Sequence, residues 1–204
     1  MIKNLIIAPH YDDEILGVGG LMSKYSGKQE FHVCIVTNGY FGNPKLYNSN
    51  HMINLLKISE KIKKLIKIKK YHLLNLPATK LDSIPLSKIS DSISNLIRKI
   101  KPNRIFLPSY KDLHIDHRLI YEASLVSLRP IYKHKIDMIL SYEVLSETDW
   151  GSELGIGFQP NYYEKLSKKD LDLKLKLFKL YVTEVKKFPH PRSLKGIQNL
   201  SHNR

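Results

Sequence analysis

Apolar residues follow two alternating patterns along the chain. Short, continuous apolar runs rich in β-branched residues are typical of strands buried on both faces. In the stretches between them, apolar residues recur every three or four positions, as on one face of a helix. The first pattern predicts strands at residues 1–8, 31–37, 71–76, 104–108 and 136–144. The second predicts helices at residues 14–25, 51–69 and 86–100, from the end of the polar stretch 109–118 to Leu128, and around residues 171–185.

The alternation of strands and helices predicts a three-layer α/β fold on a mainly parallel sheet. Residues 38–50, 77–85 and 145–160 contain turn-forming residues and are expected to be loops. Residues 171–177 alternate leucine with charged residues, which also suits an exposed strand, but the length of the apolar pattern favours a helix. No repeat, low-complexity tract or linker divides the sequence, so we expect a single domain over residues 1–204.

The composition is that of a folded protein. The 204 residues are 42% hydrophobic, which allows a core without disulfide or metal staples. No apolar stretch approaches the roughly 18 residues of a membrane helix, and the first apolar run ends at His10, too early for a signal peptide. The single cysteine, Cys34, lies in an apolar run and is expected in the core. Because it cannot form an intramolecular disulfide, we expect a cytoplasmic protein.

The formal charge is strongly basic, at +14 from 33 Lys and Arg against 19 Asp and Glu. Such a charge favours phosphate-bearing partners in general. Here the lysines are spread along predicted helix faces and accompany abundant isoleucine and asparagine, as an AT-rich coding sequence also produces. We therefore expect no nucleic-acid partner, and an anionic substrate or a membrane surface are the alternatives.

Two clusters of metal-binding side chains follow two of the predicted strands. In an open α/β sheet, ligands bind at the carboxyl ends of the strands, so the clusters face each other if these strands are neighbours. Two histidines and a carboxylate suffice for a catalytic zinc, which keeps one position for water. Each cluster alone has a structural explanation, because acids stabilise a helix N-terminus and histidines are common in loops. The clusters are His10, Asp12 and Asp13 after residues 1–8, and His114, Asp116 and His117 after residues 104–108.

The first cluster is followed by the glycines of "GVGG" (17–20). These glycines would let the first helix pack close to the sheet. They do not form a phosphate loop, because no "GKS" or "GKT" follows them.

Both clusters lie in motifs that resemble those of a known family. "APHYDDEILGVGG" (8–20) resembles the HPDDE-type signature of the PIG-L/LmbE zinc-dependent deacetylases, and "DLHIDHR" (112–118) resembles their HxDH-type signature. The resemblance implies a Rossmann-like three-layer sandwich and hydrolysis of an N-acyl group, usually the N-acetyl group of an amino sugar. It extends, in order, to "LNLPATKLD" (74–82), "SYEV" (141–144) and "FQPNYY" (158–163).

The resemblance also implies roles for the residues of the two clusters. Asp12 would be the general base, and a protonated His114 would stabilise the oxyanion. Asp116 would orient His114. Either Asp12 or His114 would protonate the leaving amine, a choice that the residues leave open. Zinc, or another divalent metal, would be held by His10, Asp13 and His117.

The chain departs from the family pattern in three places. Tyr11 replaces the usual proline, which removes no metal ligand. Lys57 stands where many members carry a substrate-binding arginine, so the charge persists without the two-pronged hydrogen bonding of arginine. The sequence stops at Arg204, before the family's acidic-aromatic motif, so the domain would lack the family's C-terminal end.

Besides Lys57, which lies in the predicted helix 51–69, further substrate-binding candidates lie in family-like motifs near predicted strand ends. A structural role in loop hydrogen bonding is an equal alternative for each of them. Trp150 would be either a sugar platform or a loop anchor. The candidates are Lys57, Asp112, Tyr142, Glu143 and Asn161.

The sequence thus predicts a cytoplasmic zinc hydrolase that deacetylates a small amino sugar or its nucleotide-, lipid- or glycan-linked conjugate. An anionic conjugate would suit the basic charge, and a homo-oligomer would complete a pocket left open at the C-terminus. The alternatives are a metal phosphoesterase with the same ligand types, a non-catalytic protein that binds nucleic acid or a surface, and a degenerate deacetylase.

Overall fold

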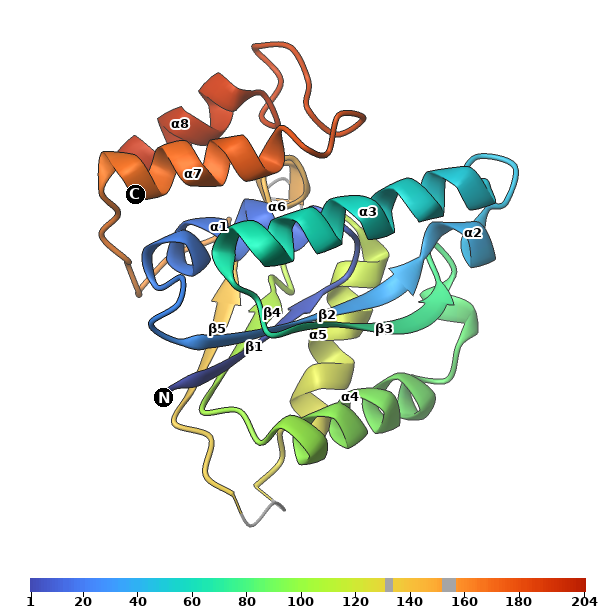
Figure 1. Ribbon diagram of the computed structural model, residues 1–204. Helices are drawn as coiled ribbons and strands as arrows, with labels where there is room; N and C mark the ends of the chain where they lie inside the picture. Colours follow the sequence, from blue (N-terminus) through green and yellow to red (C-terminus); the bar gives the residue numbers. More distant parts are fainter. Residues whose placement is uncertain (131–133, 152–156) are drawn as a thin grey trace.

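A parallel β-sheet forms the centre of the computed structural model, which describes residues 1–130, 134–151 and 157–204 (Figure 1). The strand order across the sheet is β3-β2-β1-β4-β5, and every pair of neighbours is parallel. This confirms the predicted α/β class. The strands of the described residues are β1 (Lys3–Ala8), β2 (Glu30–Asn38), β3 (Lys70–Pro77), β4 (Arg104–Pro108) and β5 (Met138–Tyr142).

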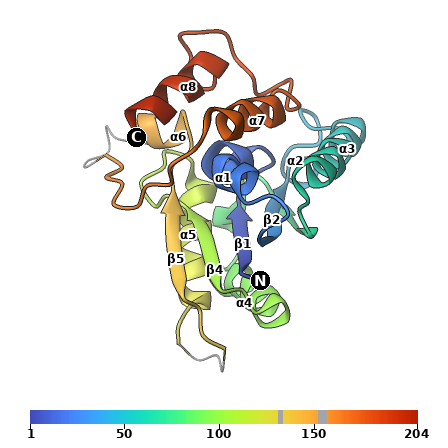
Figure 2. The same ribbon diagram turned by 60° about the vertical axis from the view of Figure 1, so that its left-hand side comes forward.

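Helices cover both faces of the sheet and complete a three-layer sandwich (Figures 1 and 2). Side chains alternate along β1, so that Ile6 and Ala8 pack into one core while Leu5 and Ile7 pack into the other. The first core is covered by α1 (Asp13–Lys24), α3 (Ser49–Ile66), α7 (Lys168–Phe178) and α8 (Leu194–Asn203). The second is covered by α4 (Leu86–Ile100) and α5 (Ile115–Ser127).

Short helices occupy two stretches that were expected to be loops. The short helix α2 (Gly39–Gly42) lies within residues 38–50, and α6 (Glu147–Gly151) lies within residues 145–160. Such short helices bury too few side chains to leave a periodic apolar pattern. A 3₁₀ turn, η1 (Leu81–Ser83), lies in the third expected loop. Residues 152–156 of the predicted loop lie outside the described residues.

The C-terminal part of the chain differs most from the sequence-based expectation. The helix predicted around residues 171–185 ends at Phe178, and Val182 is exposed. The chain turns after Phe178 because Tyr181 is buried instead of Val182, and its hydroxyl donates a hydrogen bond to Glu14. Helix α8 was not predicted, since among its residues only Ile197 is fully buried.

The glycines of "GVGG" were predicted to let the first helix pack close to the sheet, and Gly17 of α1 does so against β5, while Gly20 lies against the segment before α7. A Cβ atom on Gly17 would lie 2.1 Å from Cδ2 of Tyr142, and one on Gly20 would lie 2.4 Å from Cδ1 of Leu166. Cys34 is buried in the core, as expected. No helix in the described part of the chain is long and apolar enough to span a membrane.

Lys174 of α7 is a buried cation that should lower the stability of the fold near neutral pH. Its Nζ donates to the carbonyl oxygen of Leu16 at 2.7 Å, and burial lowers its pKa from 10.5 to about 8. The folded protein therefore binds fewer protons than the unfolded chain between pH 8 and pH 10.5, and stability rises with pH across this window. We expect Lys174→Met to be more stable than the wild type at pH 7 by about 3 kcal/mol.

The measurement is urea unfolding of both proteins at several pH values. The two free energies of unfolding should converge as the pH rises through 10.5, because only above that pH is the lysine largely neutral in both states. Lys176→Met, on the exposed side of the same helix, is the control and should show no such convergence. A stability difference that is constant with pH would contradict the assignment to a buried charge.

Candidate metal centre

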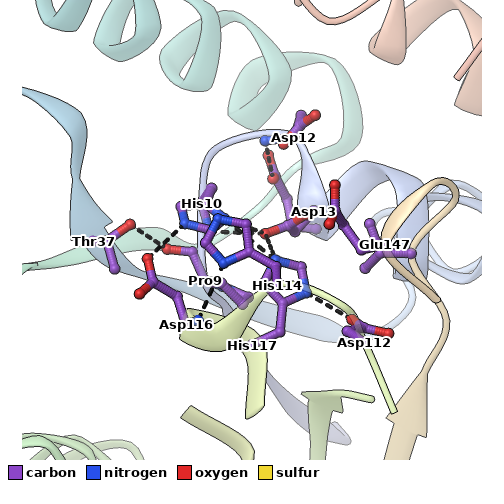
Figure 3. A network of polar contacts seen from close by, with 12 residues as sticks. Pro9, His10, Asp12, Asp13, Thr37, Asp112, His114, Asp116, His117 and Glu147 are labelled. Carbon is purple, nitrogen blue, oxygen red and sulfur yellow. Dashed lines mark hydrogen bonds and ion pairs between the residues drawn. The ribbon is translucent and has the colours of Figure 1, made fainter. Parts of the chain in front are cut away.

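The two predicted clusters lie together at the carboxyl ends of neighbouring strands (Figure 3). Strand β1 pairs with β4 in parallel, with Asn4 opposite Arg104 and Ile6 opposite Phe106. The turn after β1 and the start of α5 after β4 therefore meet at the same edge of the sheet. This adjacency was the condition on which the sequence-based prediction of one site depended.

Three side chains place one donor atom each at the corners of a nearly equilateral triangle. His10 Nδ1, Asp13 Oδ2 and His117 Nε2 are separated from one another by 3.3 Å. Zinc bonds of about 2.0–2.2 Å in tetrahedral geometry separate their donor atoms by about 3.3–3.5 Å. Oδ1 of Asp13 is buried and has no hydrogen-bond partner among the described residues. These residues, which we call the metal triangle, fit a divalent metal ion.

Buried carboxylates orient both histidines of the metal triangle. Asp112 Oδ2 lies 2.7 Å from His117 Nδ1, and Asp116 Oδ2 lies 3.1 Å from His10 Nε2. A proton on each of these outer nitrogens leaves the inner nitrogen free to bind a metal, the usual arrangement around metal-binding histidines. A second possible ligand group, His10 with His114 and Asp116, is less suitable because Asp116 already binds His10.

Two of the predicted roles are corrected by these contacts. The carboxylate of Asp116 was expected to orient His114 but instead binds His10 and the backbone N–H of Thr79. Only the backbone N–H of Asp116 contacts His114, at 3.1 Å from Nδ1. Asp112 was a candidate to face the substrate, but it is fully buried and binds His117 and Thr148.

The electrostatics of the metal triangle favour a cation. Burial lowers the pKa of His117, but the carboxylates of Asp13 and Asp112 outweigh it and raise the value to about 10. The pKa of His10 is also raised, because Asp116 and Asp13 outweigh its burial. Burial raises the pKa of Asp13, yet the two histidines hold it well below the usual range. Without a metal, these raised pKa values favour the protonated forms of both histidines.

The turn between β1 and α1 holds Asp12 beside the metal triangle. Asp12 has a φ of 93°, in the left-handed region. Its N–H donates to Glu14 Oε2 at 2.9 Å, and Glu14 Oε1 accepts from the hydroxyls of Tyr71 and Tyr181. Burial, with the nearby charge of Asp13, raises the pKa of Asp12 well above its usual value. The buried carboxyl of Glu14 thus fixes the backbone that carries Asp12.

Arg192 joins the site from a part of the chain that the sequence analysis did not single out. Its Nη1 lies 3.3 Å from Asp12 Oδ2, and the same guanidinium contacts Glu147 and Glu184. It follows α7 in a proline-containing stretch, 180 positions from Asp12. No spacing in the sequence connects such distant residues.

His114 lies beside the metal triangle as a neutral hydrogen-bond donor. Nδ1 accepts from the N–H of Asp116 at 3.1 Å, so the proton of a neutral ring is on Nε2. Burial lowers the pKa of His114 to about 4, with a further contribution from the positive charges of His10 and His117. Burial thus favours the neutral ring in this structure, and the predicted role of a protonated His114 stays a prediction.

A small cleft opens above the metal triangle. Its volume is about 210 Å³. His10, Asp12 and His114 line it, together with residues from several loops and from α3. The other lining residues are Tyr11, Thr37, Gly39, Tyr47, His51, Met52, Leu55, Ala78, Thr79, Glu147, Glu184 and Arg192.

The predicted substrate-binding residues do not line this cleft. Tyr142 is buried and donates to the carbonyl of Ile7 at 2.8 Å, which accounts for it structurally. Glu143 binds Arg204. Tyr142, Glu143 and Asn161 border a different cavity, of about 1,170 Å³, between α1, β5 and α7. Lys57 on α3 is exposed and lines neither of these two cavities. The substrate-binding roles of Lys57, Glu143 and Asn161 stay predictions.

Trp150, in α6, packs edge-on against His190 with ring centroids 5.6 Å apart. It is 46% exposed, and it does not border the cleft over the metal triangle. The contact with His190 favours the loop-anchor alternative for Trp150.

The orienting carboxylate of Asp112 provides a test of the metal triangle. We expect Asp112→Asn to lower the zinc affinity about 10- to 100-fold, because it weakens the hydrogen bond that fixes the His117 tautomer. Zinc affinity can be measured by competition with a chromophoric chelator. Asp91→Asn on the surface of α4 is the matched control and should bind like the wild type. Equal affinity in Asp112→Asn would argue against His117 as a ligand.

Comparison with known proteins identifies relatives of this chain. The family model of PIG-L, described as GlcNAc-PI de-N-acetylase, matches residues 5–127. The diacetylchitobiose deacetylase of Thermococcus kodakarensis is 26% identical over 178 residues, which cover 81% of this chain. The chain spans only 64% of the length of that relative.

Solved structures share the fold at low sequence identity. The A40926 pseudoaglycone deacetylase Dbv21 superimposes with a TM-score of 0.76 at 15% identity, covering 98% of this chain and 90% of Dbv21. GalB, the 4-carboxy-2-hydroxymuconate hydratase of Pseudomonas putida KT2440, gives a TM-score of 0.66 at 13% identity. The match covers 98% of this chain and 84% of GalB. Since a deacetylase and a hydratase both have this fold, the fold alone does not determine the reaction.

Proposed function

This chain belongs to the PIG-L family, and from that membership we propose that it is a metal-dependent hydrolase that removes the N-acetyl group of an amino sugar. The observation that carries the proposal is the metal triangle, whose three donor atoms are 3.3 Å apart beside Asp12 and His114. The Thermococcus relative is a diacetylchitobiose deacetylase, which supports an N-acetylated sugar as substrate.

The donor set of the metal triangle suits zinc in particular. Two imidazole nitrogens and one carboxylate oxygen leave a fourth position open, as in catalytic zinc sites. Zinc held by His10, Asp13 and His117 would lower the pKa of a water molecule to about 7 and polarise the acetamide carbonyl. We propose zinc as the resident metal on this basis.

The protein's own groups would handle the protons of the reaction. Asp12 would accept a proton from the attacking water, and the Nε2–H of neutral His114 would donate a hydrogen bond to the developing oxyanion. The amine leaves poorly unless it is protonated. Because burial raises the pKa of Asp12 and lowers that of His114, Asp12 is the better proton donor to the amine. The same carboxyl would then act first as base and later as acid.

The proposed function can be tested by measuring acetate release from a panel of N-acetylated sugars. Metal-free protein would be reconstituted with zinc and incubated with N-acetylglucosamine, N,N'-diacetylchitobiose and nucleotide-linked N-acetylglucosamine. We expect release from at least one compound, its loss with a chelator, and its return when zinc is added. Release that persists in metal-free protein, or no release by zinc-loaded protein, would contradict the proposal.

A further inference from the structure

The cleft above the metal triangle is acidic, although the protein as a whole is strongly basic. The formal charge of the chain is +14. No lysine occurs among the described residues that line the cleft, and Arg192 is the sole arginine there. Three acids, Asp12, Glu147 and Glu184, line it as well. The basic charge of the chain is therefore located away from this cleft.

Arg192 does not offer a free positive charge to a ligand. Its Nη1 lies 3.3 Å from Asp12 Oδ2 and 3.2 Å from Glu184 Oε2, and its Nη2 lies 3.2 Å from Glu147 Oε1. Its Nε donates to the hydroxyl of Ser146 at 2.8 Å. One guanidinium is thus shared by three carboxylates, which leaves negative charge in excess.

Charges below the cleft do not reverse this balance. Asp13, Asp112 and Asp116 are buried directly beneath it, around the histidines of the metal triangle. A divalent metal ion would add two positive charges, Arg192 adds one, and Arg118, which donates to the carbonyl oxygens of Asp112 and Leu113, adds one more. The six acids outnumber these four charges, also when Asp12 is counted as protonated. The sign of the local field is therefore set by the carboxylates.

The two glutamates are placed where a ligand can reach them. The side chain of Glu147, in α6, is 16% exposed, and that of Glu184, after α7, is 32% exposed. Carboxylates accept hydrogen bonds from hydroxyl and ammonium groups and repel phosphate. At about 210 Å³ the cleft is smaller than the roughly 300–1,000 Å³ of typical ligand pockets, so it has room for about one sugar ring. Groups attached to that ring would lie near these glutamates.

We infer that Glu147 and Glu184, held together by Arg192, determine which amino sugars the cleft accepts. They select sugars whose reacting ring and its immediate substituents are uncharged or carry an ammonium group. They reject sugars with a phosphate on that ring. This inference rests on the proposed deacetylase function and names the substrate class of the same cleft. It separates neutral glycan-type substrates from sugar phosphates and nucleotide-linked sugars.

The experiment compares three substrates of the zinc-reconstituted protein: the methyl β-glycoside of N-acetylglucosamine, N-acetylglucosamine 1-phosphate, and a chitobiose with one acetyl group and one free amine. We expect kcat/KM for the phosphate to be at least about tenfold below that of the neutral glycoside. In the Glu147→Gln, Glu184→Gln double variant, the ratio of kcat/KM for the neutral glycoside to kcat/KM for the phosphate should fall to about threefold or less. High salt should also lower this ratio for the wild type, because salt screens the part of the repulsion between the glutamates and the phosphate that acts through solvent.

Glu122→Gln, on the exposed face of α5, removes the same charge away from the cleft and should keep the wild-type ratio. Binding of the corresponding deacetylated products, methyl glucosaminide and glucosamine 1-phosphate, would be measured by calorimetry in parallel. If none of the substrates is turned over but the neutral product binds more tightly, the charge preference stands and the deacetylase proposal fails. Equal or tighter binding of the phosphate, no binding of either product, or a ratio unchanged in the double variant would overturn the inference.

Discussion

Asp12→Asn should retain a full equivalent of zinc and lose about 10²–10⁴-fold in the rate of acetate release, the usual contribution of a general base. Asparagine is the appropriate replacement for two reasons. It tolerates the left-handed φ of 93° at this position, and its side-chain oxygen can still accept from Arg192. Zinc content by atomic emission and initial rates of acetate release at saturating substrate provide the two measurements.

The result separates a catalytic role of Asp12 from a structural one. The exposed acid Asp82, replaced by asparagine, is the matched control and should leave both zinc content and rate unchanged. A variant at Asp12 that is loaded with zinc and fully active would remove Asp12 from the mechanism. A variant that loses zinc would show instead that Asp12 supports the metal triangle.

His117→Ala should lose both the metal and the activity. His117 is fully buried, and its Nε2 is one of the three donor atoms of the metal triangle. Removing it leaves two protein donors and takes away the partner of Asp112 Oδ2, so we expect zinc content below about 0.1 per chain and acetate release at background. Dialysis against a zinc buffer followed by metal analysis tests this, with circular dichroism to confirm folding.

His202→Ala, which removes an exposed histidine of α8, is the control for nonspecific effects and should keep its zinc. A folded His117→Ala protein that still binds one zinc tightly would place the metal elsewhere. The second histidine-containing group, with His114 and Asp116, would then be the next site to test.

The residues of the metal triangle could be predicted from the sequence because each lies in a short motif next to a strand. Asp13 is at the start of α1, and His117 is in the first turn of α5. The parallel pairing of β1 with β4 then brings these helix starts together. What local pattern could not show was the direction of each side chain, and for that reason Asp116 was paired with the wrong histidine.

The walls of the cleft could not be predicted in the same way. Glu147 lies in a short helix within a stretch that looked like a loop, and Glu184 and Arg192 follow the early end of α7. Arg192 contacts Asp12, Glu147 and Glu184, so these side chains meet through tertiary contacts between segments far apart in the sequence. Hydrophobic periodicity contains no information on such contacts, since the residues are polar and lie either in a helix too short to show a periodic pattern or outside regular elements.

The central claim is that one metal ion, bound at the metal triangle, is required for deacetylation. The most direct test is to titrate metal-free protein with zinc while following the release of acetate and of free amine from one active substrate. We predict that the rate rises linearly to one equivalent of zinc per chain, and that acetate and amine appear in equal amounts. A metal-free protein that already releases acetate at the full rate, or a rate that does not respond to the first equivalent of zinc, would contradict the claim.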